Sequence, residues 1–207
     1  MKTLLPVALQ ESLVDDLVAQ GWAICDDFLP PVLTRQLAAE CRQRYAQGLL
    51  RQATLGRGRA QVVRESLRGD AIQWLEPEQS VITDAYLVAM EGLQLVLNRS
   101  LYLGLEDYEC HFTCYPPGAF YEKHLDRFRD DDRCELSALF YLNEDWSAAT
   151  GGALRLHLDE QRSMYVQPVA GRLLLFRSAR LWHEALPARR ERLSLTGWFR
   201  RRGAGVF

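Results

Sequence analysis

The sequence lacks a long apolar run that could cross a bilayer, and it lacks an excess of charge of one sign. Its 207 residues include 25 lysines and arginines against 27 aspartates and glutamates, which gives a formal net charge of −2. Such a balance creates no overall field that would draw the protein onto nucleic acid or an anionic membrane. We therefore expect neither nucleic acid nor a membrane as a partner.

Cysteine is sparse as well. The chain has five cysteines, an odd number, and no C-x-x-C spacing, so neither a disulfide framework nor a structural zinc site is predicted. The opening stretch MKTLLPVALQ has one lysine and a brief apolar run, but acidic side chains at Glu11, Asp15 and Asp16 follow before the core of a secretory leader is complete. Together these absences favour a cytoplasmic protein with reduced thiols.

Internal repeats and low-complexity tracts are also missing, and 48% of the residues are hydrophobic. A chain of this length can bury one substantial core but is short for two. We expect a single domain over residues 1–207, in which helices of residues 1–100 support a strand-rich core in residues 101–207. The expected oligomeric state is a monomer.

Three segments of the first half repeat apolar residues at helical spacing. The predicted helices cover residues 12–21, 31–48 and 80–98. The first would begin with a capping pattern at Ser12 and Asp15 and end at Gly21, and a short strand, Trp22–Cys25, would follow it. The glycine-containing stretch QATLGRGRAQVV (52–63) is predicted to be a mobile loop that joins two strands.

From Tyr108 onward, apolar and polar residues alternate with a period of two, which is typical of strands. The segments are YECHFTCY, ELSALFYL, ALRLHL, RLLLF and RLSLTGWF. The turns PPG, DDD and TGG leave no room for helical crossovers, so antiparallel strands in a sandwich or barrel are favoured over a parallel sheet. The predicted fold class is therefore α+β, with the N-terminal helices packed on a β-sandwich.

The segment YEKHLDRF (121–128) carries the sharpest chemical signal. Residues two apart in a strand point to the same face, so His124 and Asp126 can present an imidazole and a carboxylate to one metal ion. The H-x-D pattern alone is common. His183 adds weight, because it directly follows the apolar strand GRLLLF and its connection RSARLW. Two histidines and one carboxylate form a facial triad that suits non-haem Fe(II), whereas a closed zinc site would want four ligands.

A cation completes the pattern. Arg192 lies nine residues beyond His183 and shares a strand face with Ser194, Thr196 and Trp198. A buried guanidinium offers a planar fork that a carboxylate can fill, and it needs such a partner because an unpaired buried charge is costly. The alternative is a surface arginine beside its basic neighbours.

With these residues identified, the sequence resembles the 2-oxoglutarate- and Fe(II)-dependent oxygenases, and within them the prolyl hydroxylases of the oxygen-sensing type. The resemblance covers roughly residues 50–200. It rests on the ordered motifs RGDAIQW (68–74), CYPPGAFYEKHLD (114–126), RCELSALFYLNEDW (133–146), GGALRL (151–156), GRLLLF (171–176) and HEALPARRERLSLTGWF (183–199).

The resemblance implies a double-stranded β-helix core of the jelly-roll or cupin-like kind. It implies that His124, Asp126 and His183 ligate iron, and that Arg192 forms a salt bridge with the distal carboxylate of 2-oxoglutarate. The implied catalytic set consists of these four residues. The implied cofactors are Fe(II), 2-oxoglutarate as cosubstrate and O2, with ascorbate as an optional reductant.

Further roles follow from the resemblance alone. Tyr141 would donate a hydrogen bond to the same carboxylate, Tyr115 and Thr196 would line the cosubstrate pocket, and Trp198 would form part of its wall. For the tyrosines and the tryptophan, packing in the barrel core is an equally open interpretation.

The substrate region is also implied by the resemblance. Residues 52–63 would correspond to a substrate-covering loop, and Arg133 and Tyr121 would lie near the substrate entrance, unless they belong to the solvated rim. Two local departures, a shorter CYPPG turn and a longer RCELSALFYLN segment, concern the substrate and leave the triad intact.

The implied activity is hydroxylation of C4 in a prolyl residue of a protein loop, with release of succinate and CO2. A translation factor such as elongation factor Tu is the candidate protein, by family analogy. Alternatives are an oxygenase of a free amino acid or other small metabolite, and a non-catalytic β-sandwich that binds iron. Nucleic-acid repair is disfavoured by the acidity of the chain and the short spacing from His183 to Arg192.

Two further histidines, His111 and His157, lie in alternating strands and are interpreted as structural or exposed. The acidic run at residues 130–132 is interpreted as a solvated loop.

Overall fold

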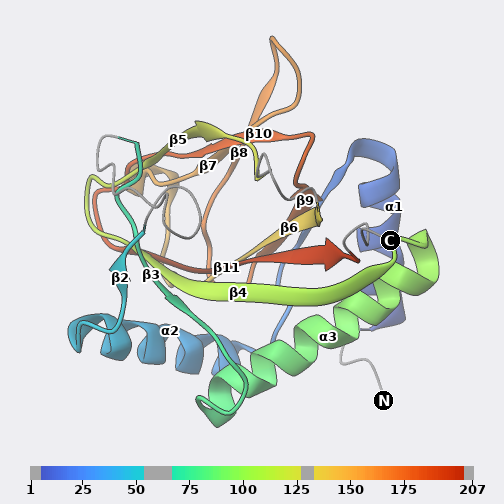
Figure 1. Ribbon diagram of the computed structural model, residues 1–207. Helices are drawn as coiled ribbons and strands as arrows, with labels where there is room; N and C mark the ends of the chain where they lie inside the picture. Colours follow the sequence, from blue (N-terminus) through green and yellow to red (C-terminus); the bar gives the residue numbers. More distant parts are fainter. Residues whose placement is uncertain (1–5, 54–66, 127–132, 203–207) are drawn as a thin grey trace, which may run out of the picture.

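The computed structural model describes residues 6–53, 67–126 and 133–202. Most of the predicted loop over 52–63 and the acidic run at 130–132 lie outside the described residues, so both interpretations stay predictions. The described part consists of two antiparallel sheets that face each other, with helices on the outer side of the larger sheet (Figure 1).

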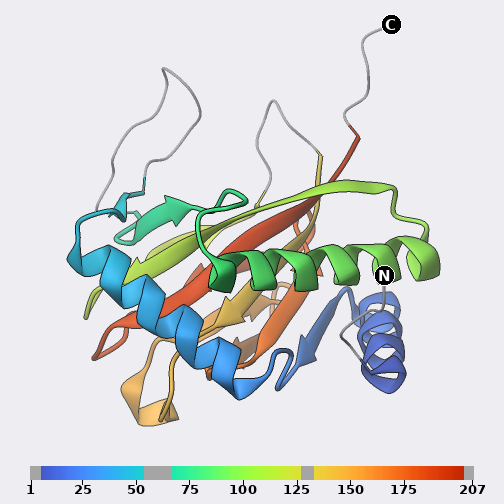
Figure 2. The ribbon, with the colours of Figure 1, turned by 90° about the horizontal axis from the view of Figure 1, so that it is seen from below.

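The helices lie mainly in the first half of the chain. They are α1 (Val7–Gln20), α2 (Pro31–Ala46), α3 (Val81–Leu101) and the short 3-10 helix η2 (Ala148–Thr150). In Figure 2, α2 and α3 run across one face of the large sheet, and α1 lies beside β1. No helix in the part of the chain that the structure describes is long and apolar enough to span a membrane.

The strands divide into two sheets. The seven-stranded sheet has the order β1 (Trp22–Cys25), β9 (Leu173–Arg177), β6 (Cys134–Tyr141), β11 (Arg192–Arg201), β4 (Leu105–Tyr115), β3 (Ala71–Trp74) and β2 (Arg51–Gln52). The four-stranded sheet has the order β5 (Tyr121–His124), β10 (Trp182–Ala185), β7 (Leu154–His157) and β8 (Ser163–Val166). Every pairing between these strands is antiparallel, which confirms the predicted α+β class.

Alternation along the central strands builds two apolar layers. On β6, Leu136 and Phe140 face the helices, whereas Leu139 and Tyr141 face the small sheet. The helical layer is the larger and includes the buried faces of all three long helices. Because each central strand is covered on both sides, its residues are almost all buried, as β9 with the run LLLF illustrates.

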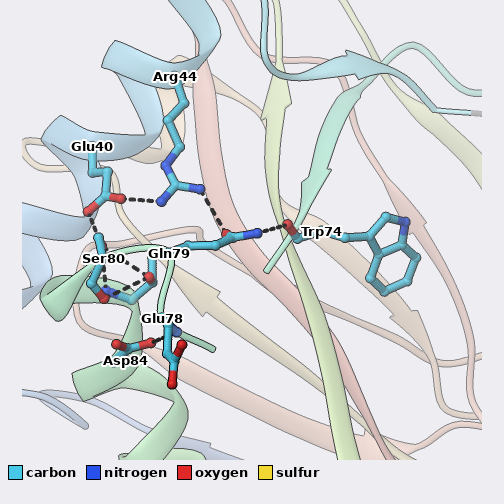
Figure 3. A network of polar contacts seen from close by, with 8 residues as sticks. Glu40, Arg44, Trp74, Glu78, Gln79, Ser80 and Asp84 are labelled. Atoms are coloured by element: carbon cyan, nitrogen blue, oxygen red, sulfur yellow. Dashed lines mark hydrogen bonds and ion pairs between the residues drawn. The ribbon is translucent and has the colours of Figure 1, made fainter. Parts of the chain in front are cut away.

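A polar network fixes α2 against the start of α3 (Figure 3). The hydroxyl of Ser80 accepts a hydrogen bond from the backbone N–H of Thr83 at 3.1 Å and donates to Glu40 at 2.9 Å. Glu40 also pairs with Arg44, whose guanidinium donates to Gln79 at 3.1 Å. The chain of contacts therefore caps α3 and connects it to α2, through half-buried groups around Ser80 and Glu40 and an exposed one at Gln79.

The predicted start of the first helix is wrong. The helix begins at Val7 rather than at Ser12, and it has no side-chain cap. Pro6 precedes the first turn with φ of −55°, a value already suited to helix entry, so Ser12 lies inside the helix. The predicted end is confirmed, because Gly21 adopts the left-handed conformation with φ of 80°. The other two long helices begin within a residue of their predicted starts.

Candidate active site

The structure brings His124, Asp126 and His183 together between the two sheets. His124 ends β5, and its partner across the β5–β10 pairing is His183. One ligand atom from each of the three residues can be chosen so that all lie within 4.8 Å of one another. The three are therefore close enough for one ion, and a set of two imidazoles and a carboxylate suits non-haem Fe(II).

Both imidazoles are oriented by backbone carbonyls. His124 Nδ1 lies 2.7 Å from the carbonyl oxygen of Glu122, and His183 Nδ1 lies 3.1 Å from that of Leu181. A carbonyl oxygen can only accept, so each Nδ1 carries the proton and each Nε2 keeps its lone pair. Both Nε2 atoms face Asp126, at 3.5 Å and 3.6 Å from its carboxylate oxygens. The tautomers that a metal requires are thus set before any metal binds.

Asp126 is held by Ser137 on β6. The Ser137 hydroxyl donates to Asp126 Oδ2 at 2.7 Å and contacts the hydroxyl of Ser178 at 2.9 Å. Burial raises the pKa of Asp126, but the neighbouring histidines and the Ser137 hydrogen bond outweigh it, so its pKa lies well below the ordinary value. Asp126 is therefore ionised at neutral pH, the form that a metal ligand requires.

His183 is the most enclosed of the three, with 4% of its surface exposed. Burial lowers its pKa to about 4, although the charge of Asp126 works in the opposite direction. The ring also packs edge-on against Phe176, with centroids 4.7 Å apart. A neutral imidazole is the form that ligates a metal, so His183 is ready for binding throughout the physiological range.

Arg192 lies on β11, where its residue surface is 1% exposed. Its guanidinium carbon lies 5.0 Å from the ring centre of Tyr115 and 5.2 Å from that of Tyr141. Two of its nitrogens, Nε and one terminal nitrogen, have no hydrogen-bond partner among the described residues, and neither has the Tyr141 hydroxyl. Buried donors without partners are costly. An anion with carboxylate geometry would satisfy all of them, so the site suits 2-oxoglutarate.

A cavity of about 190 Å³ connects these groups. Its lining includes the three candidate ligands and Arg192, together with the predicted pocket residues Tyr115, Tyr121, Thr196 and Trp198. Tyr141 is not part of this lining, but its ring lies beside the Arg192 guanidinium. Arg133, which immediately precedes β6, does not line the cavity either, so the structure gives no support to its predicted place at the substrate entrance.

A stack of side chains covers His124. The Tyr121 ring lies parallel to the His124 imidazole, with centroids 3.7 Å apart and an angle of 18°. The guanidinium carbon of Arg68 lies over the Tyr121 ring, 4.7 Å from its centre, and Arg68 pairs with the buried Asp70 through two hydrogen bonds of 2.6 Å and 2.9 Å. The RGD segment before β3 therefore supports, through Tyr121, a candidate ligand that lies more than 50 residues later in the chain.

Sequence reasoning gave His111 no part in the site. His111 is 1% exposed, but it lines the cavity from β4, and its ring lies 4.9 Å from Trp74 and 5.6 Å from Trp198. The signal that could have found it is the alternation in YECHFTCY, which puts His111 on the same strand face as Tyr115. His157 lies elsewhere, on β7, where it contacts Glu184 at 3.0 Å.

Comparison with known proteins identifies relatives of this chain. Residues 110–200 match the 2OG-Fe(II) oxygenase superfamily. Human prolyl hydroxylase EGLN3 is 31% identical over 197 residues, which cover 91% of this chain and 82% of that protein.

Solved structures agree with the sequence comparison. A prolyl-4-hydroxylase from Pseudomonas putida is 54% identical, covers 94% of this chain and 100% of its own, and superimposes with a TM-score of 0.86. A prolyl hydroxylase from Trichoplax adhaerens, in complex with a hypoxia inducible factor peptide fragment, is 29% identical with a TM-score of 0.84, over 93% of this chain and 89% of its own. These neighbours confirm the expected double-stranded β-helix fold.

Proposed function

Because the chain belongs to the 2OG-Fe(II) oxygenase superfamily and is homologous to the EGLN prolyl hydroxylases, we propose that it hydroxylates C4 of a prolyl residue in a protein substrate. The observation that carries this proposal is the shared cavity, which joins the His-Asp-His cluster to a buried guanidinium without a full set of partners.

In this proposal, His124, Asp126 and His183 hold Fe(II) through the two Nε2 atoms and one carboxylate oxygen. Arg192 receives the distal carboxylate of 2-oxoglutarate, and the Tyr141 hydroxyl donates to the same group. Burial raises the pKa of Tyr141, an effect that the charge of Arg192 partly offsets, so the phenol is a proton donor at neutral pH. Bound Fe(II) and 2-oxoglutarate supply O2 activation coupled to oxidative decarboxylation, with succinate and CO2 as products.

The other cavity residues exclude water and guide the substrate. Trp74 and Trp198 form an aromatic side with ring centroids 6.1 Å apart, and Tyr121 forms a second side next to His124. A pyrrolidine ring is compact and apolar, and flat aromatic faces suit it. Trp74 is 45% exposed, so it also offers an outer face to the chain around the target proline.

We propose a protein rather than a free amino acid as the substrate, and elongation factor Tu as the first candidate. The support is analogy: the Trichoplax relative is described in complex with a peptide fragment. An oxygen-sensing role fits the same homologues. In that case the rate of hydroxylation would still increase with O2 concentration near ambient values.

The test is incubation of purified elongation factor Tu and of free proline with the enzyme, Fe(II), 2-oxoglutarate and O2. Mass spectrometry of peptides would report the gain of one oxygen atom, and amino-acid analysis would separate the C3 and C4 products. The matched control is the His183→Ala protein. Succinate release with free proline and no modified protein would overturn the proposal in favour of a small-metabolite oxygenase.

A further inference from the structure

Four polar side chains lie side by side between Arg192 and Trp198, and three of them, His111, Thr113 and Thr196, line the cavity. Two belong to β4, His111 and Thr113, and two belong to β11, Ser194 and Thr196. The strands pair so that Ser194 is opposite Thr113 and Thr196 is opposite His111. Residues two apart share a strand face, so all four side chains point to the same side. His111, Thr113 and Ser194 are at most 1% exposed, and Thr196 reaches the cavity.

Three of these groups are connected in a line. His111 Nδ1 lies 2.9 Å from the Thr113 hydroxyl, which donates to the Thr196 hydroxyl at 3.1 Å. Ser194 lies farther from Thr196, at 3.4 Å between the hydroxyl oxygens. The line therefore runs from a buried imidazole to a hydroxyl at the cavity wall, and we call it the His111 relay.

The direction of the relay is fixed at its inner end. His111 Nδ1 also lies 3.2 Å from the backbone carbonyl oxygen of Phe112, and a carbonyl oxygen can only accept. Nδ1 must then carry a proton, which it shares between the carbonyl and the Thr113 hydroxyl oxygen. Thr113 is left to donate onward, and Thr196 accepts. The Thr196 hydroxyl therefore keeps its own proton, which it can donate to the Ser194 hydroxyl at 3.4 Å or to a group in the cavity.

We propose that His111 is a positioning residue, which acts through Thr113 to make the Thr196 hydroxyl a hydrogen-bond donor to an oxygen atom of 2-oxoglutarate. This inference rests on the proposed function, because it needs 2-oxoglutarate in the cavity. It deepens that function by assigning the direction of a hydrogen bond. With the other imidazole tautomer, Thr113 would donate to His111 and Thr196 would donate to Thr113, so only lone pairs would face the ligand.

The protonation state of His111 agrees with this role. Burial, and then the charge of Arg68, lower its pKa to about 4, so the ring is neutral at physiological pH. A neutral imidazole carries a single N–H, and the hydrogen bond to the Phe112 carbonyl places that proton on Nδ1. An edge-on contact with Trp74 and a tilted contact with Trp198 hold the ring, and its Nδ1 lies toward Thr113.

The first test observes the tautomer directly and requires no turnover. The chain has four histidines, so ¹⁵N NMR of the labelled, metal-free protein gives a small set of imidazole signals. The His111→Asn protein identifies the His111 pair by its disappearance. We expect a protonated Nδ1 and a bare Nε2 for His111. A protonated Nε2 with a bare Nδ1 would overturn the relay, whatever the protein catalyses.

The second test measures 2-oxoglutarate binding to the Mn(II)-loaded protein by titration calorimetry. Thr113→Val removes the hydroxyl at constant shape and breaks the relay, whereas Thr113→Ser keeps a hydroxyl there. For the valine variant we expect a dissociation constant raised about 5- to 10-fold, the effect of one lost hydrogen bond, and for the serine variant a value near that of the wild type.

Two variants of His111, at the buried end of the relay, are compared in the same titration. His111→Leu removes the donor, and His111→Asn retains an N–H near the position of Nδ1, so binding should weaken in the first and recover in the second. Thr34→Val is the matched control for loss of a buried hydroxyl, since Thr34 is 3% exposed in α2 and its hydroxyl donates to the Pro30 carbonyl, outside the cavity lining. Thermal unfolding checks that each variant is folded.

The outcomes separate the two proposals. If the wild-type Mn(II) protein does not bind 2-oxoglutarate, the proposed function fails. If the wild type binds and folded Thr113→Val binds equally well, the relay is wrong while the function stands. Equal weakening in Thr113→Val and Thr113→Ser would also overturn the relay, because a hydroxyl would then not be the group that matters.

Discussion

His124 and His183 occupy opposite positions in the pairing of β5 with β10, and their rings are 4.2 Å apart at an angle of 54°. Each imidazole is oriented by its own backbone carbonyl through Nδ1. The two Nε2 atoms are therefore available to bind one ion together with a third ligand. The pairing of two short strands thus fixes the distance between donors that are far apart in the chain.

Replacement of His183 by alanine should abolish binding of Fe(II). Two ligands remain, and a facial site with two ligands binds weakly. An anaerobic titration with Fe(II) and 2-oxoglutarate should show the visible charge-transfer band in the wild type and not in the variant. His157→Ala is the control, since His157 lies on β7 outside the cavity lining and contacts Glu184. A band that survives in His183→Ala would contradict the ligand assignment.

Replacement of Arg192 by methionine should act in opposite directions on binding and stability. Affinity for 2-oxoglutarate should fall about 100-fold, because a charged bidentate contact is lost. The ligand-free protein should keep its stability or gain about 1 kcal/mol, because a buried cation without a full set of partners disappears. Calorimetry and urea unfolding measure the two effects. Marked destabilisation of the ligand-free variant would show that Arg192 is a structural residue.

The free energy of unfolding should depend on pH through His111. The pKa of this group is 6.5 when unperturbed and about 4 in the folded protein. Between these values the unfolded chain binds a proton that the folded chain excludes, so stability is complete above pH 6.5 and falls as the pH drops, by about 1.4 kcal/mol per pH unit. Urea unfolding of the metal-free protein at several pH values tests this. His111→Asn should show a smaller slope, and an identical slope would refute the assignment.

Replacement of Asp70 by alanine should destabilise the protein by about 3 kcal/mol, because Arg68 would keep its charge under Tyr121 with no carboxylate to pair with. Urea unfolding gives the value. The ion pair between Asp159 and Arg162 is the control: both side chains are well exposed, so Arg162→Ala, which leaves the backbone hydrogen bonds to Asp159 in place, should have no measurable effect. Equal effects of the two substitutions on the free energy of unfolding would mean that the Arg68–Asp70 pair stabilises the protein no more than an exposed ion pair does.

Local patterns were sufficient to predict the fold class and most of the strands, because a period of two is visible in the residues themselves. The strand predicted to carry both His124 and Asp126 ends at His124, so Asp126 lies in the bend that follows, and the structure still brings both residues together with His183. The start of the first helix was missed because the pattern at Ser12 resembles a cap equally well inside a helix. β8 lies in the stretch QRSMYVQ, which has too few apolar residues to show the alternation.

Other features could not be read from the sequence because they depend on contacts between distant segments. His111 faces the cavity rather than the helices, and only the position of the second sheet decides between these two layers. The Arg68–Tyr121–His124 stack joins three segments whose proximity no periodicity reports. The approach of the Tyr141 ring to Arg192 likewise joins β6 to β11, and the motif around Tyr141 does not reveal it.

The pairing of β11 with β4 runs without a shift from Arg192 to Arg200. Insertion of a single residue within this stretch of either strand would reverse every side chain beyond it, so that Thr196 and Trp198 would exchange sides with their neighbours. An insertion or deletion within these strands would therefore destroy the lining of the cavity, whereas the substitution of one side chain would not. Enzymes that diverge from this one should differ in these strands by substitution, and should vary in length only where the chain turns between them.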